Sequence, residues 1–216
     1  MIYNSQRAGY AIFLCVLVLA SCKGRVKSNQ QENINKIRQQ VSMDIRTDTS
    51  NIWSSFHNVR QLSKQLNLKS PEEGFDSLQI RIWFDYSLAK KKHLIIIEQQ
   101  NNKWNGRLYE MNVDYVDTLN YDIVQHYDKK NVRPASGWPQ FIKDLYQLKF
   151  QELSDTSGGG TDGITYCVEL LTPGTYTYYN FYEPENNKDN NWKSANMVKI
   201  IALLEREFKF NSLKSR

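Results

Sequence analysis

Apolar residues recur from residue 51 onward at spacings that predict three helices and six strands. Large apolar side chains from Trp53 to Leu66 follow one another by three or four positions, the period of a helix that buries one face. The segments 136–145 and 197–208 show the same helical spacing. From Leu78 onward the period changes to two, which is typical of strands. The predicted strands are 78–85, 93–99, 107–114, 121–127, 164–171 and 175–182.

The connections between these strands are short, and this decides how neighbours pair. Asn101–Gly106 and Thr172–Gly174 are turn-forming stretches of a few residues, whereas a parallel crossover needs a dozen residues or more. Antiparallel neighbours are therefore expected. The sequence predicts an α+β fold: an antiparallel sheet of about five to six strands, with the helices packed on one face of it.

We expect the folded domain to cover residues 51–216 and to follow a polar tether at 22–50. The tether is rich in Gln, Asn, Lys and Ser and has no aromatic residue, which is the composition of a spacer. Apolar residues nevertheless recur at steps of three and four in its second half, which predicts a frayed helix that docks on the domain or pairs with another copy. They are Ile34, Ile37, Val41 and Ile45. The oligomeric state stays open.

The formal charge of +5 invites a nucleic-acid partner, but its distribution argues against one. Residues 51–216 hold 21 Lys and Arg against 20 Asp and Glu, while residues 22–50 hold 6 against 3. The excess positive charge therefore lies in the leader and the tether, and no basic face is expected on the domain.

The first 21 residues have the layout of a secretory signal peptide. One cation, Arg7, precedes the uncharged run Ala8–Leu19, which is too short for a permanent membrane span. The segment Leu19-Ala20-Ser21-Cys22 then resembles the lipobox of bacterial lipoproteins. The resemblance is confined to this leader.

The resemblance implies cleavage between Ser21 and Cys22, followed by acylation of the Cys22 thiol. Two or more acyl chains would hold the mature protein at a membrane, because each buried methylene contributes about 0.8 kcal/mol. In this family an aspartate after the cysteine retains the protein in the inner membrane. Lys23 occupies that position. The expected location is therefore the outer membrane, with the domain facing the periplasm.

No complete catalytic or metal-binding constellation is evident in the sequence, and no cofactor is expected. Cys15 leaves with the leader and Cys22 carries lipid, so Cys167 alone remains and is expected to be a small buried residue. Ser87 and Lys90 match the Ser-x-x-Lys spacing of penicillin-binding enzymes, but the other motifs of those enzymes are missing. The three histidines, His57, His93 and His126, have no partner at zinc-ligand spacing.

The tyrosine-rich hairpin is the most suggestive surface. Tyr176, Tyr178 and Tyr182 share one face of a predicted strand, and together with Trp192 they could meet a sugar or a protein, although core packing is the alternative. The first hypothesis is thus a non-enzymatic, lipid-anchored domain that binds an envelope protein or glycan. The alternatives are a purely structural spacer and a hydrolase that uses carboxylates, which would come from Asp114, Asp117, Asp122, Glu169 or Glu183.

Overall fold

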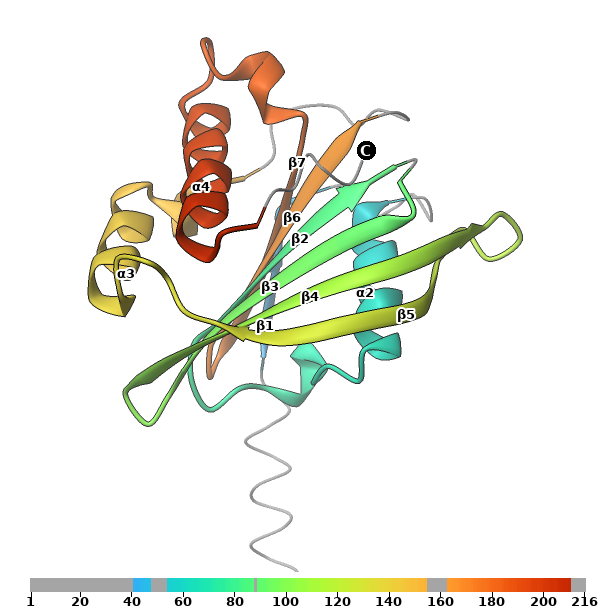
Figure 1. Ribbon diagram of the computed structural model, residues 1–216, viewed down its shortest axis with the longest axis horizontal. Helices are drawn as coiled ribbons and strands as arrows, with labels where there is room; N and C mark the ends of the chain where they lie inside the picture. The colour runs from blue at the N-terminus through green and yellow to red at the C-terminus, as the bar shows by residue number, and fades with distance from the viewer. Residues whose placement is uncertain (1–40, 48–53, 88, 155–162, 211–216) are drawn as a thin grey trace, which may run out of the picture. The chain divides into compact units, whose positions relative to one another are not determined.

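Seven strands form one sheet in this protein (Figure 1). The computed structural model describes residues 41–47, 54–87, 89–154 and 163–210, all in one unit that begins at Val41. The strands are β1 (Ser42–Ile45), β2 (Gln79–Tyr86), β3 (Lys91–Gln100), β4 (Lys103–Val116), β5 (Tyr121–Val132), β6 (Ile164–Leu171) and β7 (Thr175–Tyr182). The helices are α2 (Ser55–Gln65), α3 (Trp138–Gln147) and α4 (Trp192–Phe208), with single turns η1 (Pro71–Glu73), η2 (Phe150–Glu152) and η3 (Pro184–Asn187). The α+β class is confirmed.

The strand order is β1-β7-β6-β2-β3-β4-β5, and every pair except β1 with β7 is antiparallel. Short turns join β2 to β3, β3 to β4, β4 to β5 and β6 to β7, as the short connections predict. Asn101 and Asn102 turn the chain between β3 and β4 in the left-handed region, at φ 49° and 61°. Asparagine tolerates this region better than most residues.

The expected count of five to six strands is wrong because β1 adds a seventh. The predicted helix over Ile34–Ile45 is also contradicted at its end, since residues 42–45 are extended and pair in parallel with β7. Arg46 fixes this segment. Its backbone N–H donates to the Tyr178 carbonyl at 2.8 Å, and its guanidinium donates to the carbonyls of Gln151 and Leu153, both at 2.9 Å. The unit thus includes a strand that the sequence analysis placed in the tether. Residues 1–40, which include the expected signal peptide, Ser21 and Cys22, lie outside the described residues.

Buried side chains form two clusters on opposite faces of the sheet. Along β2, Ile80, Ile82 and Phe84 join one cluster and Trp83 the other, as alternation in a strand requires. The first cluster contains the buried faces of α3 and α4, and the second contains that of α2. The buried helix faces therefore divide between both sides of the sheet, which differs from the one-sided packing expected. Among the described residues, no helix is both long and apolar enough to cross a bilayer.

A buried polar cluster fixes α2 against the sheet. The ammonium of Lys92 on β3 bridges the carboxylates of Asp85 on β2 and Asp122 on β5, and the Asn58 amide of α2 donates to Asp122 at 2.6 Å. Two turns further along α2, the Gln65 amide donates to the Asp122 carbonyl, and its oxygen accepts from the backbone of β5, both at 2.8 Å. Burial alone would lower the pKa of Lys92, but the two carboxylates raise it. Lys92 is therefore charged, and it fixes the Asp122 carboxylate that Asn58 of α2 contacts.

Candidate ligand-binding pocket

A half-open pocket of about 740 Å³ lies where α2 ends above the sheet. One wall is the connection from α2 to β2, and the floor comes from strands β2 to β5 on the α2 face. Its volume is in the range of small-molecule sites. The lining is formed by Leu66, Asn67, Leu68, Lys69, Phe75, Asp76, Ser77, Gln79, Arg81, Ile96, Glu98, Gln100, Asn101, Arg107, Tyr109 and Lys129.

Arg81 is the buried centre of this lining. It is fully shielded from solvent, and strand alternation places it on the α2 face beside Trp83. Its Nε donates to the Gln79 amide oxygen and its Nη2 to the Lys69 carbonyl, each at 2.7 Å. Nη1 makes no hydrogen bond and lies 3.8 Å from a carboxylate oxygen of Glu169. A guanidinium carries five N–H donors, so this side chain retains unused binding capacity.

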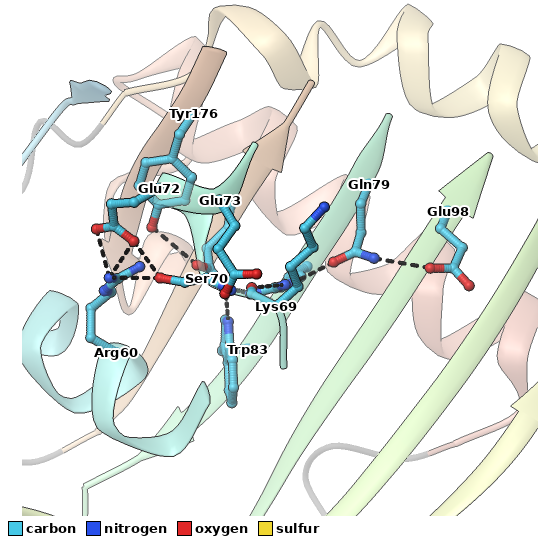
Figure 2. Close-up of polar contacts among 11 residues, drawn as sticks. Arg60, Lys69, Ser70, Glu72, Glu73, Gln79, Trp83, Glu98 and Tyr176 are labelled. Atoms are coloured by element: carbon cyan, nitrogen blue, oxygen red, sulfur yellow. Dashed lines mark hydrogen bonds and ion pairs between the residues drawn. The ribbon is translucent and has the colours of Figure 1, made fainter. Parts of the chain in front are cut away.

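Glu169 on β6 is the buried counter-charge of Arg81. One of its oxygens accepts from the indole Nε1 of Trp83 at 2.7 Å and the other from the hydroxyl of Tyr176 at 3.0 Å. Figure 2 shows Trp83 and Tyr176 in this network. Burial and the neighbouring Glu169 raise the pKa of Tyr176, so its hydroxyl stays protonated and can donate. Each oxygen of Glu169 thus accepts one hydrogen bond from a buried side chain.

Glu98 is held in a similar way at the other end of the floor. One oxygen of Glu98 accepts from the Gln79 amide at 2.9 Å and from Nη2 of Arg107 at 2.7 Å. The first of these contacts is drawn in Figure 2. Nε of Arg107 is buried and makes no hydrogen bond. The floor therefore joins two arginines, each paired with one carboxylate, through the shared amide of Gln79.

Phe75 covers the buried arginine. Its ring lies with its centroid 5.5 Å from Cζ of Arg81, and Nζ of Lys69 lies 5.0 Å from the same centroid. Gly74, with φ 68°, sets the turn from η1 into this cover, a backbone conformation that favours glycine. The Phe75 side chain is half-buried. The ring is thus the layer between Arg81 and the open part of the pocket.

The turn η1 that precedes this cover is fixed to α2 by charge. Arg60 of α2 donates from Nη2 to both oxygens of Glu72, at 2.7 and 2.8 Å, and the Ser70 hydroxyl also donates to Glu72 (Figure 2). Burial opposes ionisation of Glu72, but these hydrogen bonds hold its pKa at about 2. The pocket wall is therefore tied to α2 at neutral pH.

The residues predicted as a binding surface do not form one exposed face. Tyr176 and Tyr178 are fully buried in the cluster under α2, Tyr182 is half-buried at the end of β7, and Trp192 is 49% exposed. Trp192 begins α4, which packs on the other side of the sheet. Since Tyr176 and Tyr178 lie in the core, they are not available to a ligand from solution, and only Tyr176 contributes to the pocket network, through Glu169.

The other candidate groups are placed apart from one another. The Ser87 hydroxyl donates to a backbone carbonyl, and the Lys90 side chain is 86% exposed and 3.8 Å from Asp114. Cys167 is buried, and burial raises the pKa of its thiol, which disfavours the reactive thiolate. Among the carboxylates, Asp122 binds Lys92 and Glu169 lies near Arg81. The described ranges contain no group of His, Cys, Asp and Glu placed to hold a metal ion.

The sequence analysis missed the pocket residues Arg81, Arg107 and Glu98. The alternation of β2 assigns Arg81 to the polar face of the strand. If helices cover only the other face of the sheet, this polar face lies in water. The signal that could have found it is the run Leu94–Ile97 on the neighbouring strand, where four consecutive apolar residues indicate burial of both faces. An arginine on a strand that pairs with such a doubly buried strand is itself expected to be buried by another element.

Comparison with protein families, with curated proteins and with solved structures found no match to this chain.

Proposed function

We propose that this protein is a lipid-anchored cell-envelope protein whose domain binds a ligand in the pocket at the end of α2. Acylation of Cys22 after cleavage at Ser21 would hold it at the outer membrane, facing the periplasm. The support for the anchor is the leader with its lipobox pattern. The observation that carries the binding role is the buried Arg81 in the pocket wall, with one nitrogen that no described residue hydrogen-bonds. Buried donors without an acceptor are rare, and a ligand supplies one explanation.

A non-enzymatic role fits the chemistry of the pocket best. Arg81 and Glu98 are both engaged in fixed contacts, and such groups orient a ligand more readily than they transfer protons. The ligand class remains that of an envelope protein segment or a glycan, either of which the pocket volume could admit in part.

Hydrolysis is the alternative, and one observation favours it. Asp76 and Glu98 both line the pocket, and a glycan hydrolase needs two carboxylates across a cleft. Hydrolysis requires both carboxylates, so Asp76→Asn would abolish turnover of a peptidoglycan fragment or peptide if this alternative holds. Under the binding proposal, neither the parent protein nor the variant converts such a substrate.

The experiment that tests the binding role is photo-cross-linking in intact cells. A photoreactive residue replaces Asn101, which is exposed at the pocket rim, and in a matched control it replaces Tyr146, which is 45% exposed on α3. We expect a covalent adduct from position 101 and none from position 146. Equal yields from both positions, or no adduct from position 101, would contradict a binding role for the pocket.

The anchor is tested separately with Cys22→Ser. We expect the parent protein in the membrane fraction, with an acylated mature terminus at residue 22. The Cys22→Ser protein should lack the acyl mass and leave the membrane fraction. Retention of Cys22→Ser in the membrane would contradict the anchor without bearing on the pocket.

A further inference from the structure

We propose that the pocket selects ligands that carry one carboxylate, received by the unbonded guanidinium donors of Arg81 and Arg107. This inference rests on the proposed binding role and names the chemistry of the ligand.

Two buried donors without an acceptor line the same pocket. Nη1 of Arg81 and Nε of Arg107 are both shielded from solvent, and neither hydrogen-bonds any described residue. The nearest carboxylates do not hydrogen-bond these two donors. Glu169 accepts from Trp83 and Tyr176, and one oxygen of Glu98 accepts from Gln79 and from Nη2 of Arg107. A ligand carboxylate would supply the acceptor that both donors lack.

The sheet places the two arginines in one row. Arg81 on β2 is the register partner of Ile96 on β3, which is in turn the partner of Arg107 on β4. Register partners point to the same face, and strands lie about 4.8 Å apart, so the two Cα atoms are separated by about 10 Å. Ile96 lines the pocket between the two arginines and supplies an apolar part of its floor.

The charge of the site favours a single negative charge. The pocket lining contains four cations, Lys69, Arg81, Arg107 and Lys129, and two anions, Asp76 and Glu98. Glu169, just behind Arg81, adds a third anion. One positive charge is left unbalanced, which a carboxylate neutralises and a phosphate dianion would exceed. Carboxylates also accept two parallel hydrogen bonds from a guanidinium.

The ligand reaches Arg81 only when Phe75 moves. Nη1 has no exposed surface, and the Phe75 ring lies over this guanidinium. Once displaced, the ring can lie against the body of the ligand, opposite the buried Tyr109 at the pocket wall. The amides of Gln100 and Asn101 at the rim suit hydroxyl or peptide groups. A uronic-acid sugar and the free carboxyl end of a peptide share this chemistry.

Isothermal titration calorimetry on the purified full-length protein tests the proposal. The probes are a glucuronate-containing disaccharide, its counterpart with the carboxyl reduced to an alcohol, a tripeptide with a free carboxyl end, its amidated form, and inorganic phosphate. We expect at least one carboxylate probe to bind, and its neutral counterpart to bind at least tenfold more weakly. Equal binding of the neutral counterpart, or tighter binding of phosphate, would overturn the inference. The carboxylate probe that binds identifies the source.

Variants distinguish the arginines from general charge. Arg107→Gln should weaken binding of the carboxylate probe at least tenfold, whereas Lys130→Gln, outside the pocket lining on β5, should change it less than twofold. Arg81→Lys keeps the charge beside Glu169 and should still fold, yet also weaken binding. Phe75→Ala should not slow the association of the probe, since the ring that covers Arg81 is removed. Similar losses in Arg107→Gln and Lys130→Gln would contradict a specific site.

The indole N–H resonance of Trp83 provides a direct readout. Trp83 donates to Glu169, which pairs with Arg81, so an anion at Arg81 should shift this resonance. The resonance of Trp192, exposed on α4, should not move. A shift of Trp192 alone would refute the site. If position 101 captures a ligand in cells but no carboxylate probe binds, this inference fails and the proposed function stands; if both experiments are negative, both fail.

Discussion

Replacement of Lys92 by Met removes the one cation that lies between two buried carboxylates. The side chains of Lys92, Asp85 and Asp122 are 5%, 13% and 6% exposed, so water cannot replace the lost ammonium. Met keeps the length and the apolar stem of lysine, so the change acts mainly on charge. The cluster also contains the contacts that hold α2 to β5.

The expected loss of stability is large. Removing one partner of a buried ion pair costs about 3–5 kcal/mol, because the other charge stays buried without compensation. Asp122 keeps the hydrogen bond from Asn58, and Asp85 retains a little exposure, so we expect a loss of about 3–4 kcal/mol. With a urea dependence of about 2 kcal/mol per molar, the unfolding midpoint should fall by about 1.5–2 M.

Urea unfolding followed by circular dichroism measures this loss, with Lys130→Met as the matched control. Lys130 pairs with Glu110 on the surface, where the side chains are 56% and 43% exposed, so its loss should cost less than about 1 kcal/mol. Adding Asp85→Asn to Lys92→Met removes one uncompensated charge and should recover part of the stability. If Lys92→Met unfolds within about 1 kcal/mol of the parent protein, or matches the control, the account of this cluster is wrong.

Three further outcomes follow from single sites. Gly106→Ala should destabilise by about 1–3 kcal/mol, since its methyl would lie 2.9 Å from a β5 carbonyl oxygen, whereas Gly174→Ala, with open space around it, should unfold like the parent in urea. Hydrogen bonds from Arg60 help to hold the pKa of Glu72 at about 2, below its unfolded value of 4.5. The ionised Glu72 therefore stabilises the folded state fully above pH 4.5, and this stabilisation disappears as the pH falls towards 2. In Glu72→Gln, the free energy of unfolding should therefore depend less on pH in that window. The difference should be less than about 1 kcal/mol because the Glu72 side chain is half exposed, and an unchanged pH dependence would contradict this. Cys167 should resist alkylation at pH 8 in the folded protein and react after denaturation, as peptide mass spectrometry can show; rapid labelling of the native protein would be inconsistent with its burial.

Local periodicity predicted most of the elements, because most strand pairs in this sheet join strands that follow one another along the chain. The alternation from Leu78 onward corresponds to β2, and the segments 164–171 and 175–182 are β6 and β7 as predicted. The fourth strand was placed at 121–127 but continues to Val132. The extension is polar and exposed from Asp128 to Asn131, and its backbone pairs with β4 without apolar alternation to mark it.

Long-range pairing explains what the sequence could not predict. The strand β1 has four residues, three of them exposed, and it exists because β7, more than a hundred residues later, offers a free edge. Val41 and Ile45 fit a helical spacing equally well, so local pattern alone favours the wrong element.

The candidate site depends on the same long-range information. Tyr176 and Tyr178 share a strand face, as alternation predicts, but α2 is part of the cluster on that face and buries them. Arg81 becomes the centre of a pocket only because the connection from α2 places Phe75 over it. Neither fact can be obtained from spacing, since both require knowledge of which helix packs on which side.

The central claim, that ligands bind on the α2 face between Arg81 and Arg107, is tested most directly by a map of backbone amide shifts in nuclear magnetic resonance spectra. The probe is the carboxylate ligand that binds in calorimetry. The account predicts that shifted amides gather in 66–81, 96–101 and 107–109. Shifts gathered instead around Tyr182 and Trp192 would contradict it.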